Sequence, residues 1–204
     1  MEPAEQIAEA RASADESFKN RAALIIALMA MLLAITSLGG GNAAEDMANN
    51  NIHASDTWAF YQAKSIRQTS LKVAADTLEA ELRANPDMTP EARDFINQKL
   101  EEYRKTVDRY EDEPDREDPG NPLKGEGRKQ LTARARDFES KREEAAKQDP
   151  NFDFSEALFQ IAIVLASVSI LAGSRIVLRL AIVAGAAATL LMLNGYFLLL
   201  PNLL

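Results

Sequence analysis

The chain has 204 residues, of which 47% are hydrophobic and 26% charged, and its formal net charge at pH 7 is -8. It contains no cysteine and one histidine, His53, which excludes disulfides, thiol nucleophiles and thiolate metal sites. No Ser-His-Asp order, HExxH, P-loop or GxGxxG motif occurs, so we expect no catalytic residue, no metal, no cofactor and no enzyme activity. The acidic balance, with no concentrated basic face, argues against a nucleic-acid partner.

The first apolar run, "AALIIALMAMLLAITSL" at residues 22–38, carries no charge. Crossing a bilayer takes about 20 helical residues, with a range of about 17 to 25. We therefore predict a first transmembrane helix over 22–41, preceded by an N-terminal segment over 1–21. A cleaved signal peptide is the alternative, because the small residues of "GGGNAA" follow the run. The preceding segment, however, is about 20 residues long and net acidic, whereas the start of a signal peptide is short and basic.

The C-terminal apolar run, from Ala157 to Leu200, is too long for one span and carries Arg175 and Arg179 near its middle. Two helices joined by a tight turn explain it better, since Gly173 can end one helix in a left-handed conformation and Ser174 can cap the next. The predicted segments are a transmembrane helix over 154–173, a turn and helix start over 174–179, a transmembrane helix over 180–200 and a C-terminus over 201–204.

The charges beside the spans predict their direction. Lys19 and Arg21 flank the first span, and three crossings place them on the same face as Arg175 and Arg179. By the positive-inside rule that face is the cytoplasm, so residues 43–153 and the C-terminus lie outside. The arginine stems then reach the headgroups as markers of the membrane boundary. A buried gating or substrate-binding arginine pair is the alternative.

Two amides lie inside the predicted spans at similar depth. Gln160 is roughly 5 residues from the outer end of the second span and Asn194 roughly 6 from the outer end of the third, at about 1.5 Å of rise per residue. We expect them to form an intramembrane polar pair, joined by a hydrogen bond.

The middle region, residues 42–153, is predicted to be a helical extramembrane insert that starts after a turn at Gly39–Gly41. Its first helix is expected from a cap at Ser55 or Asp56 to about Ala84, before Asn85 and Pro86. A second helix begins at a Thr89 cap with Pro90 in its first position. The apolar positions of that helix have the four-three spacing of a coiled-coil seam. They are Ile96, Leu100, Tyr103, Val107 and Tyr110.

Residues 111–127, "EDEPDREDPGNPLKGEG", break the helical pattern and predict a solvated loop. A third helix is expected over about 128–148, where Pro150 would stop it. A short connection between the first two helices of the insert favours an antiparallel hairpin. The seam would then pack against the 56–84 helix of the same chain or against another copy. A divalent-cation site in the acidic loop is an alternative, but the loop lacks the EF-hand spacing.

The main aromatic concentration, "ASDTWAFYQAKSIRQT", spans residues 54–69. Trp58, Phe60 and Tyr61 cannot share one narrow helical face, so this segment is expected to present apolar surface in two directions. Packing in the core and at the membrane interface would account for these aromatic residues. The functional alternative is that they contact a partner protein or another subunit.

The strings "LLAITSLGGGNA" and "NIHASDTWAFYQAKSIRQT" resemble a family of bacterial membrane proteins designated a domain of unknown function. The resemblance implies a three-span protein of the bacterial inner membrane with a helical insert. It implies no reaction, cofactor or catalytic residue.

Together the patterns predict an all-α protein with three transmembrane helices and a coiled-coil-like insert between the first and second. The expected function is that of a structural or scaffolding membrane protein that self-associates, or binds another membrane or envelope protein. A small oligomeric channel or transport accessory subunit is the alternative, and its weakness is the lack of ionisable residues in the spans. The expected partners are the lipid bilayer and further copies of the chain.

Overall fold

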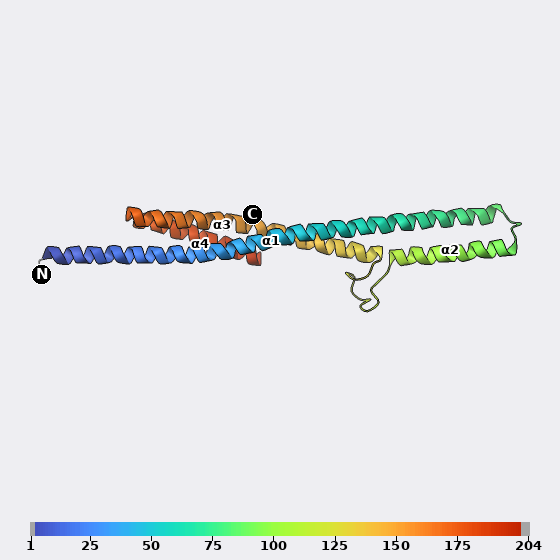
Figure 1. Cartoon of the computed structure of the whole chain (residues 1–204), viewed down its shortest axis with the longest axis horizontal. Helices are drawn as coiled ribbons and strands as arrows, with labels where there is room; N and C mark the ends of the chain where they lie inside the picture. The colour runs from blue at the N-terminus through green and yellow to red at the C-terminus, as the bar shows by residue number, and fades with distance from the viewer. Residues whose placement is uncertain (1–2, 201–204) are drawn as a thin grey trace. The chain divides into compact units, whose positions relative to one another are not determined.

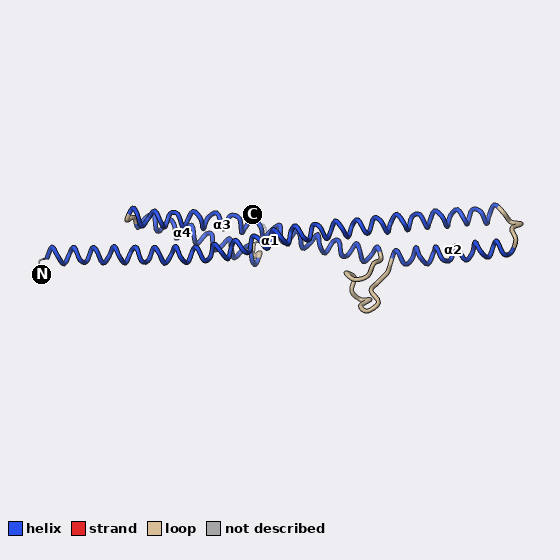
Figure 2. Tube along the Cα trace, in the orientation of Figure 1, coloured by secondary structure: helices blue, strands red, loops and turns tan. Residues whose placement is uncertain are grey.

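The computed structural model describes residues 3–200, which form four α-helices and no strand (Figure 1, Figure 2). The all-α class is therefore confirmed. The helices are α1 (Pro3–Ala84), α2 (Pro90–Glu111), α3 (Arg128–Ala172) and α4 (Arg175–Phe197). The chain divides into two compact units, to which α1 and α3 both contribute. Residues up to Met47 and from Glu143 onward form the membrane unit, and Ala48–Arg142 form the hairpin unit.

Two helix starts follow the local chemistry of the sequence. Thr89 is extended, with φ -61° and ψ 148°, and its hydroxyl accepts a hydrogen bond from the Ala92 N–H, while Pro90 takes the first helical position. At the other turn Gly173 has φ +60°, a left-handed conformation that glycine adopts without a Cβ penalty. Ser174 then caps α4 by accepting from the Val177 N–H. Both predicted boundaries are confirmed.

The predicted turn at Gly39–Gly41 and the helix start at Ser55 or Asp56 are wrong, because α1 runs without a break from Pro3 to Ala84. The first span is thus part of one long helix and not a short span followed by a separate insert. Packing explains Gly39, where an added Cβ would lie 2.6 Å from Phe152 Cε1 and 2.8 Å from the Tyr196 hydroxyl, whereas no heavy atom lies within 4 Å of an added Cβ at Gly41. Here glycine permits close approach within a helix instead of ending it.

The predicted stop at Pro150 is also wrong, since α3 continues through it to Ala172. A proline inside a helix removes one hydrogen bond and costs about 3 kcal/mol relative to alanine. The residues around it supply compensating packing, because Ala145, Asn151 and Phe152 are all buried. The Asn151 side-chain amide also donates to the Lys147 carbonyl, 2.8 Å away. Tertiary contacts therefore override the local preference.

The membrane unit joins three helices, α1, α3 and α4, each of which is long and apolar enough to cross a membrane. In α1 four buried positions recur every seven residues, at Ala22, Met29, Thr36 and Ala43, and Gly39 is buried as well. The residues that meet them are mostly small, which lets helix backbones approach closely in lipid. Two clusters hold the unit together. The first contains Met29, Phe159, Ala162, Ala188 and Met192, and the second contains Ala22, Ala166, Leu178 and Ala181.

The order of these contacts gives the path of the chain. Rising residue numbers in α1 meet falling numbers in α3 and rising numbers in α4, so α1 is antiparallel to α3 and parallel to α4. The outward faces are apolar, as Leu24 (72% exposed) and Leu171 (88% exposed) illustrate. Such a surface suits contact with lipid and not water. The chain thus has three candidate membrane spans.

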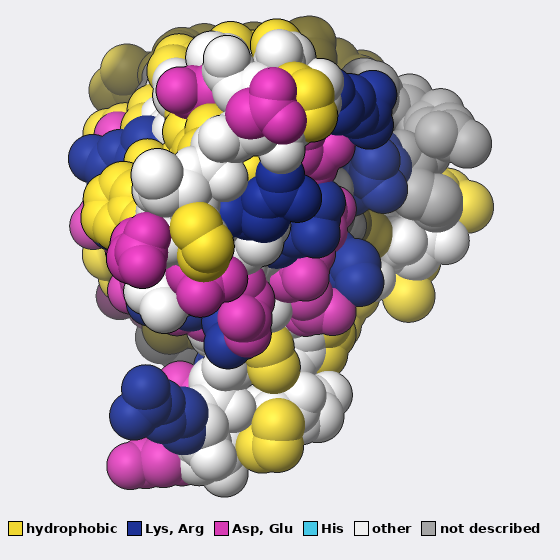
Figure 3. Space-filling view, turned by 90° about the vertical axis from the view of Figure 1, so that its right-hand side faces the viewer, with side chains coloured by type: hydrophobic (Ala, Val, Ile, Leu, Met, Phe, Trp, Pro, Cys, Tyr) yellow, Lys and Arg dark blue, Asp and Glu magenta, His cyan; other side chains and the backbone are white. Residues whose placement is uncertain are grey.

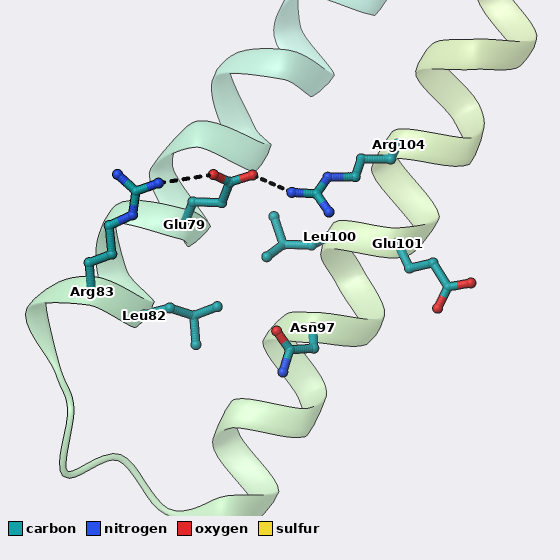
Figure 4. Close-up of a pocket in the computed structure, with 7 residues that line it drawn as sticks. All are labelled: Glu79, Leu82, Arg83, Asn97, Leu100, Glu101 and Arg104. Carbon is teal, nitrogen blue, oxygen red and sulfur yellow. Dashed lines mark hydrogen bonds and ion pairs between the residues drawn. The ribbon is translucent and has the colours of Figure 1, made fainter.

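The hairpin unit packs α2 against the last part of α1. Residues 85–89 connect the two helices. Ala75, Ile96 and Leu100 form its buried cluster, with Leu78, Leu82, Met88 and Tyr103 against it. Beside Leu100, the Glu79 carboxylate pairs with Arg104 at 2.6 Å and Arg83 at 3.7 Å (Figure 4). In the view of Figure 3, basic and acidic side chains are mixed with apolar and other side chains over the surface. This unit therefore has an apolar seam and a charged exterior.

Candidate interaction site

The aromatic segment of α1 faces the other helices of the hairpin unit with two of its three rings. Trp58 and Tyr61 pack edge to face, with ring centroids 5.5 Å apart. The Trp58 indole N–H donates to the Glu139 carboxylate at 2.9 Å. Phe60 is 41% exposed, and its ring centroid lies 5.7 Å from the Lys64 ammonium. Trp58 and Tyr61 thus contact other helices, while Phe60 keeps part of its ring exposed.

Arg128, the first residue of α3, is the centre of a polar cluster beneath these rings. Its Nη1 donates to Gln68 Oε1 at 2.6 Å and to Glu111 Oε2 at 2.9 Å, and its Nη2 donates to the Tyr61 hydroxyl at 2.7 Å. The guanidinium also lies over the Tyr61 ring, 4.9 Å from its centroid. The buried Nε has no hydrogen-bond partner. One side chain therefore joins α1, α2 and α3 within the hairpin unit.

The charges of this cluster compensate for unfavourable positions at helix ends. A cation at a helix N-terminus and an anion at a helix C-terminus both oppose the helix dipole, and these are the places of Arg128 in α3 and Glu111 in α2. Their ion pair offsets both. The hydrogen bond to Tyr61 is the main cause that raises the pKa of Arg128 further above its ordinary value, against the opposing effect of burial. Arg128 therefore stays charged and holds the three helices together through its hydrogen bonds.

Lys64 lies one helical turn before Gln68 and is 6% exposed. Its ammonium donates to Glu113 at 2.8 Å and to the Glu126 carbonyl. It also lies 5.3 Å from the centroid of the Tyr110 ring, which provides a cation-π contact. Lys64 consequently fastens both ends of the loop at residues 112–127 to α1. The sequence alone did not single out Lys64, Gln68 or Arg128. Lys64 and Gln68 are four residues apart, which places them on one face of α1.

The acidic residues of the loop bind basic groups and backbone amides of the chain. Asp112 accepts from Lys129 at 2.8 Å and from Gln130 at 2.7 Å, and these two bonds, the Lys129 bond foremost, lower the pKa of its carboxyl group. Asp118 pairs with Lys124, and Asp115 accepts from two backbone N–H groups. Within residues 3–200 there is no group of three acidic, histidine or cysteine side chains that could hold a metal ion.

The predicted seam of α2 packs against α1 of the same chain, which is one of the two expected arrangements. Ile96 and Leu100 are 7% and 5% exposed, and Tyr103 packs against them. The Val107 carbonyl accepts a hydrogen bond from Gln68 at 3.0 Å. Tyr110 is half-buried beneath Lys64. The seam thus continues into the polar cluster.

A second stripe on α1 remains uncovered within the hairpin unit. Ile52 is 55% exposed, Ile66 68% and Val73 59%. Ala59, between Ile52 and Ile66, is also exposed and completes a spacing of seven residues from Ile52 to Val73. We call these four residues the outer stripe. Sequence analysis missed it, although the repeat of seven is visible once the buried face of α1 is known.

In the membrane unit the two intramembrane amides take different partners, so the predicted Gln160–Asn194 hydrogen bond is corrected. Asn194 donates to Asn151 Oδ1 at 2.8 Å, and both residues are buried. Gln160 is exposed and donates to Glu156, four residues earlier on its own helix, at 3.3 Å. The prediction rests on the similar depth of the two amides along their helices. Asn194, however, lies on the buried face of α4 and Gln160 on the exposed face of α3. The buried Ser155 hydroxyl adds a further link by donating to the Ala188 carbonyl at 2.8 Å.

The predicted boundary arginines lie together at one end of the membrane unit. Arg21, Arg175 and Arg179 line a cavity of about 350 Å³, and all three are exposed. Lys19 is exposed and does not line it. Phe18, beside them, packs onto the cluster of Ala22 and Leu178. The structure thus places three of the four boundary cations around one hollow.

The three apolar helices and the charged hairpin define the class of the protein, an all-α chain with three candidate membrane spans. Over residues 18–198 the sequence matches the family described as Domain of unknown function (DUF4337), and the chain belongs to this family. Comparisons with curated proteins and with solved structures found no match.

Proposed function

We propose that this protein is a structural or scaffolding protein of the bacterial inner membrane that self-associates through the hairpin unit. The observation that carries the proposal is the outer stripe, where Ile52, Ile66 and Val73 expose more than half of their surface. The rest of the hairpin surface carries many charged side chains. A row of large apolar residues at a spacing of seven is the pattern that one helix presents to another.

A second copy of the chain is the occupant that suits this stripe. The stripe has the repeat of a coiled-coil face, and the same helix in another copy presents the same repeat. Such a contact is self-complementary, as in the twofold dimers that are the most frequent oligomers. It would also place Phe60, which is next to Ala59 in sequence, at the edge of the contact. Packing against another membrane or envelope protein is the competing arrangement.

The proposed orientation places the N-terminus and the arginine end in the cytoplasm and residues 43–153 with the C-terminus outside. Its support is the basic end of the membrane unit, where Lys19, Arg21, Arg175 and Arg179 lie, and the positive-inside rule. The test uses the absence of cysteine from the chain. Single cysteines at Asn49, Glu126 and Ser174 are exposed to an impermeant thiol reagent in intact cells. Labelling of positions 49 and 126 but not 174 is expected, and the reverse pattern contradicts the orientation.

Disulfide cross-linking in native membranes tests self-association. Cysteine at position 66 or 73, introduced as Ile66→Cys or Val73→Cys, should give a covalent dimer on mild oxidation. Asp94→Cys is the matched control, because Asp94 is exposed on α2 and away from the stripe. Equal cross-linking at position 94 would reflect random collision and refute the stripe as the contact.

A mass measurement of the full chain in detergent complements the cross-link. The wild-type chain should have the mass of an oligomer, and the double variant Ile66→Asp, Val73→Asp that of a monomer. Both side chains are already largely exposed, so their replacement should leave helix content and unfolding temperature close to wild type. A wild-type monomer at all concentrations would overturn the proposal.

A small oligomeric channel or transport accessory subunit is the second candidate, and one observation favours it. Glu156 and the exposed Gln160 form a hydrogen-bonded polar pair on α3, near the start of its apolar run. Ionisable groups inside a span often mark ion pathways, and Glu156 lies at the edge of one, directly before the uncharged run that begins at Ala157. The double variant Glu156→Ala, Gln160→Ala should abolish ion flux through proteoliposomes if the pair lines a pore. Wild-type proteoliposomes without flux would remove this candidate.

A further inference from the structure

The arginine end of the membrane unit has a feature that self-association does not use. Arg21 from α1 and Arg175 and Arg179 from α4 line one cavity of about 350 Å³, within the range of about 300 to 1,000 Å³ typical of small-molecule sites. None of its lining residues is acidic. Among the described side chains, no carboxylate forms an ion pair with any of the three guanidinium groups. The cavity thus concentrates positive charge without an internal counter-ion.

The other walls of the cavity are apolar and fixed. Phe18 packs against the buried cluster of Ala22, Ala166, Leu178 and Ala181, and Leu178 is 8% exposed. Ile182 lies one turn beyond Leu178 on the same helix and also lines the hollow. The Ser17 side chain is the remaining polar group. A ligand with one anionic group and an attached hydrocarbon chain matches this division into guanidinium and apolar walls.

The position of the cavity in the sequence agrees with such a ligand. Arg21 directly precedes the apolar run that begins at residue 22, and Arg179 directly precedes the one that begins at residue 180. Arg21 and Arg179 therefore lie at the start of two candidate spans, the part of a crossing helix that meets the lipid headgroups. Arginine binds phosphate through a planar fork of N–H donors, with more geometric specificity than lysine.

We infer that this cavity binds the headgroup phosphate of one anionic phospholipid, with the acyl chain along Leu178 and Ile182. A general attraction of basic residues to an anionic surface strengthens binding by about fivefold per residue and needs no cavity. Lys19 distinguishes the two cases, because it is a cation at the same end of the chain that does not line the hollow. Replacement of Lys19 or of one lining arginine by a neutral residue removes one positive charge in either case. Only the arginine replacement changes the lining of the cavity.

The experiment counts lipids bound to the full chain in neutral detergent by native mass spectrometry. Phosphatidylglycerol, phosphatidylcholine and inorganic phosphate are added separately. Wild-type protein should retain one phosphatidylglycerol, and the single variants Arg175→Gln and Arg179→Gln should each bind it about tenfold more weakly or worse. Lys19→Gln should change the affinity by less than about twofold. Circular dichroism checks that each variant keeps its helix content.

Three results would overturn the inference. Equal losses in Lys19→Gln and Arg175→Gln would show a general electrostatic attraction. Equal retention of phosphatidylcholine would show that the site does not select a net negative headgroup. If inorganic phosphate raised the unfolding temperature as much as phosphatidylglycerol does, the ligand would be the free anion. The apolar wall would then contribute nothing to binding.

Discussion

The membrane unit and the hairpin unit use the same helix, α1, but bury different kinds of residue on it. In the membrane unit the buried positions of α1 include Ala22, Met29, Thr36 and Ala43 at intervals of seven. In the hairpin unit they include Ala54, Lys64, Gln68 and Ala75, again with a seven-residue interval between Gln68 and Ala75. One step of eleven residues, from Ala43 to Ala54, separates the two series. The partners of the first series are mostly small side chains, and those of the second are Ile96, Leu100 and a charged cluster.

The difference follows from the surroundings of each unit. In water, burial of a large apolar side chain stabilises by roughly 1.5 to 3 kcal/mol, which suits Leu100 in the hairpin. In lipid the exposed state of an apolar side chain is no worse than the buried one, so close packing of small residues and hydrogen bonds must hold helices together. Gly39, Gly195 and Ser155 in the membrane unit fit this second case. The following variants test the contrast, from the largest expected effect to the smallest.

Leu100→Ala should reduce the free energy of unfolding of the hairpin by about 2 to 5 kcal/mol, because it leaves a cavity beside Ala75 and Ile96. Urea unfolding of the full chain in detergent, followed by circular dichroism, measures the loss. Glu101→Ala on the exposed side of α2 should stay within about 0.5 kcal/mol of wild type. Equal stability of Leu100→Ala and wild type would show that the seam does not hold the hairpin.

Gly39→Ala and Gly41→Ala should have opposite effects although they lie two residues apart on α1. An alanine Cβ at position 39 would lie 2.6 Å from Phe152 Cε1, and this overpacking should cost about 1 to 3 kcal/mol. At Gly41 no heavy atom lies within 4 Å of the added Cβ, so the higher helix propensity of alanine should stabilise by about 0.5 to 1 kcal/mol. The unfolding temperatures of the two variants in detergent give the sign directly. A gain at both positions would mean that the rings do not pack against α1.

Asn151 and Asn194 should be coupled in a double-mutant cycle, because they share a hydrogen bond of 2.8 Å in the membrane unit. Replacement of each by leucine should give an interaction energy of about 0.6 kcal/mol, the average for hydrogen bonds between transmembrane helices. The cycle of Gln160→Leu with Asn194→Leu is the control and should be additive. Coupling in the control cycle alone would restore the pairing that the sequence suggested.

The smallest expected effect is a pH dependence of the loop that follows α2. The bonds from Lys129 and Gln130 lower the pKa of Asp112 below the ordinary aspartate value of about 4. A lowered carboxyl pKa stabilises the fold above the unfolded value, and this contribution is lost as the pH falls through the lower, folded value. The wild type should thus exceed Asp112→Asn slightly in unfolding temperature at pH 6, and the difference should vanish towards pH 2. A difference that is constant over this range would exclude titration of Asp112 as its cause.

Sequence patterns predicted those parts of the fold that depend on local chemistry. The Thr89 cap with Pro90, and the turn at Gly173 and Ser174, follow from side-chain hydrogen bonds and backbone preferences within a few residues. The four-three spacing likewise indicated the buried face of α2. Gly39 and Pro150 were misinterpreted for the opposite reason. Their local preference is to end a helix, and contacts with Phe152 and Tyr196, more than a hundred residues beyond Gly39, override it.

The candidate site was predicted in part, because its residues come from distant segments. Trp58 and Tyr61 stood out as aromatic rings in a polar stretch. Their polar partner Arg128 lies 67 residues beyond Tyr61 in sequence, and no periodicity links the two. The outer stripe required knowledge of which face of α1 the hairpin buries. The boundary arginines were identified individually, whereas their arrangement around one cavity depends on the packing of α4 beside α1.

The path of the chain through the membrane unit also determines the order in which it can form during synthesis. α3 and α4 are joined by two residues, so they can pair as soon as both are inserted. The α1 positions that contact them, Ala22 to Gly39, are made more than a hundred residues earlier than Ser155. At about 5 to 20 residues per second, the first span waits alone in lipid for roughly 6 to 25 seconds. Its buried hydroxyl, Thr36, bonds to Leu32 of its own helix at 2.8 Å, so that side chain is already satisfied before any neighbour arrives.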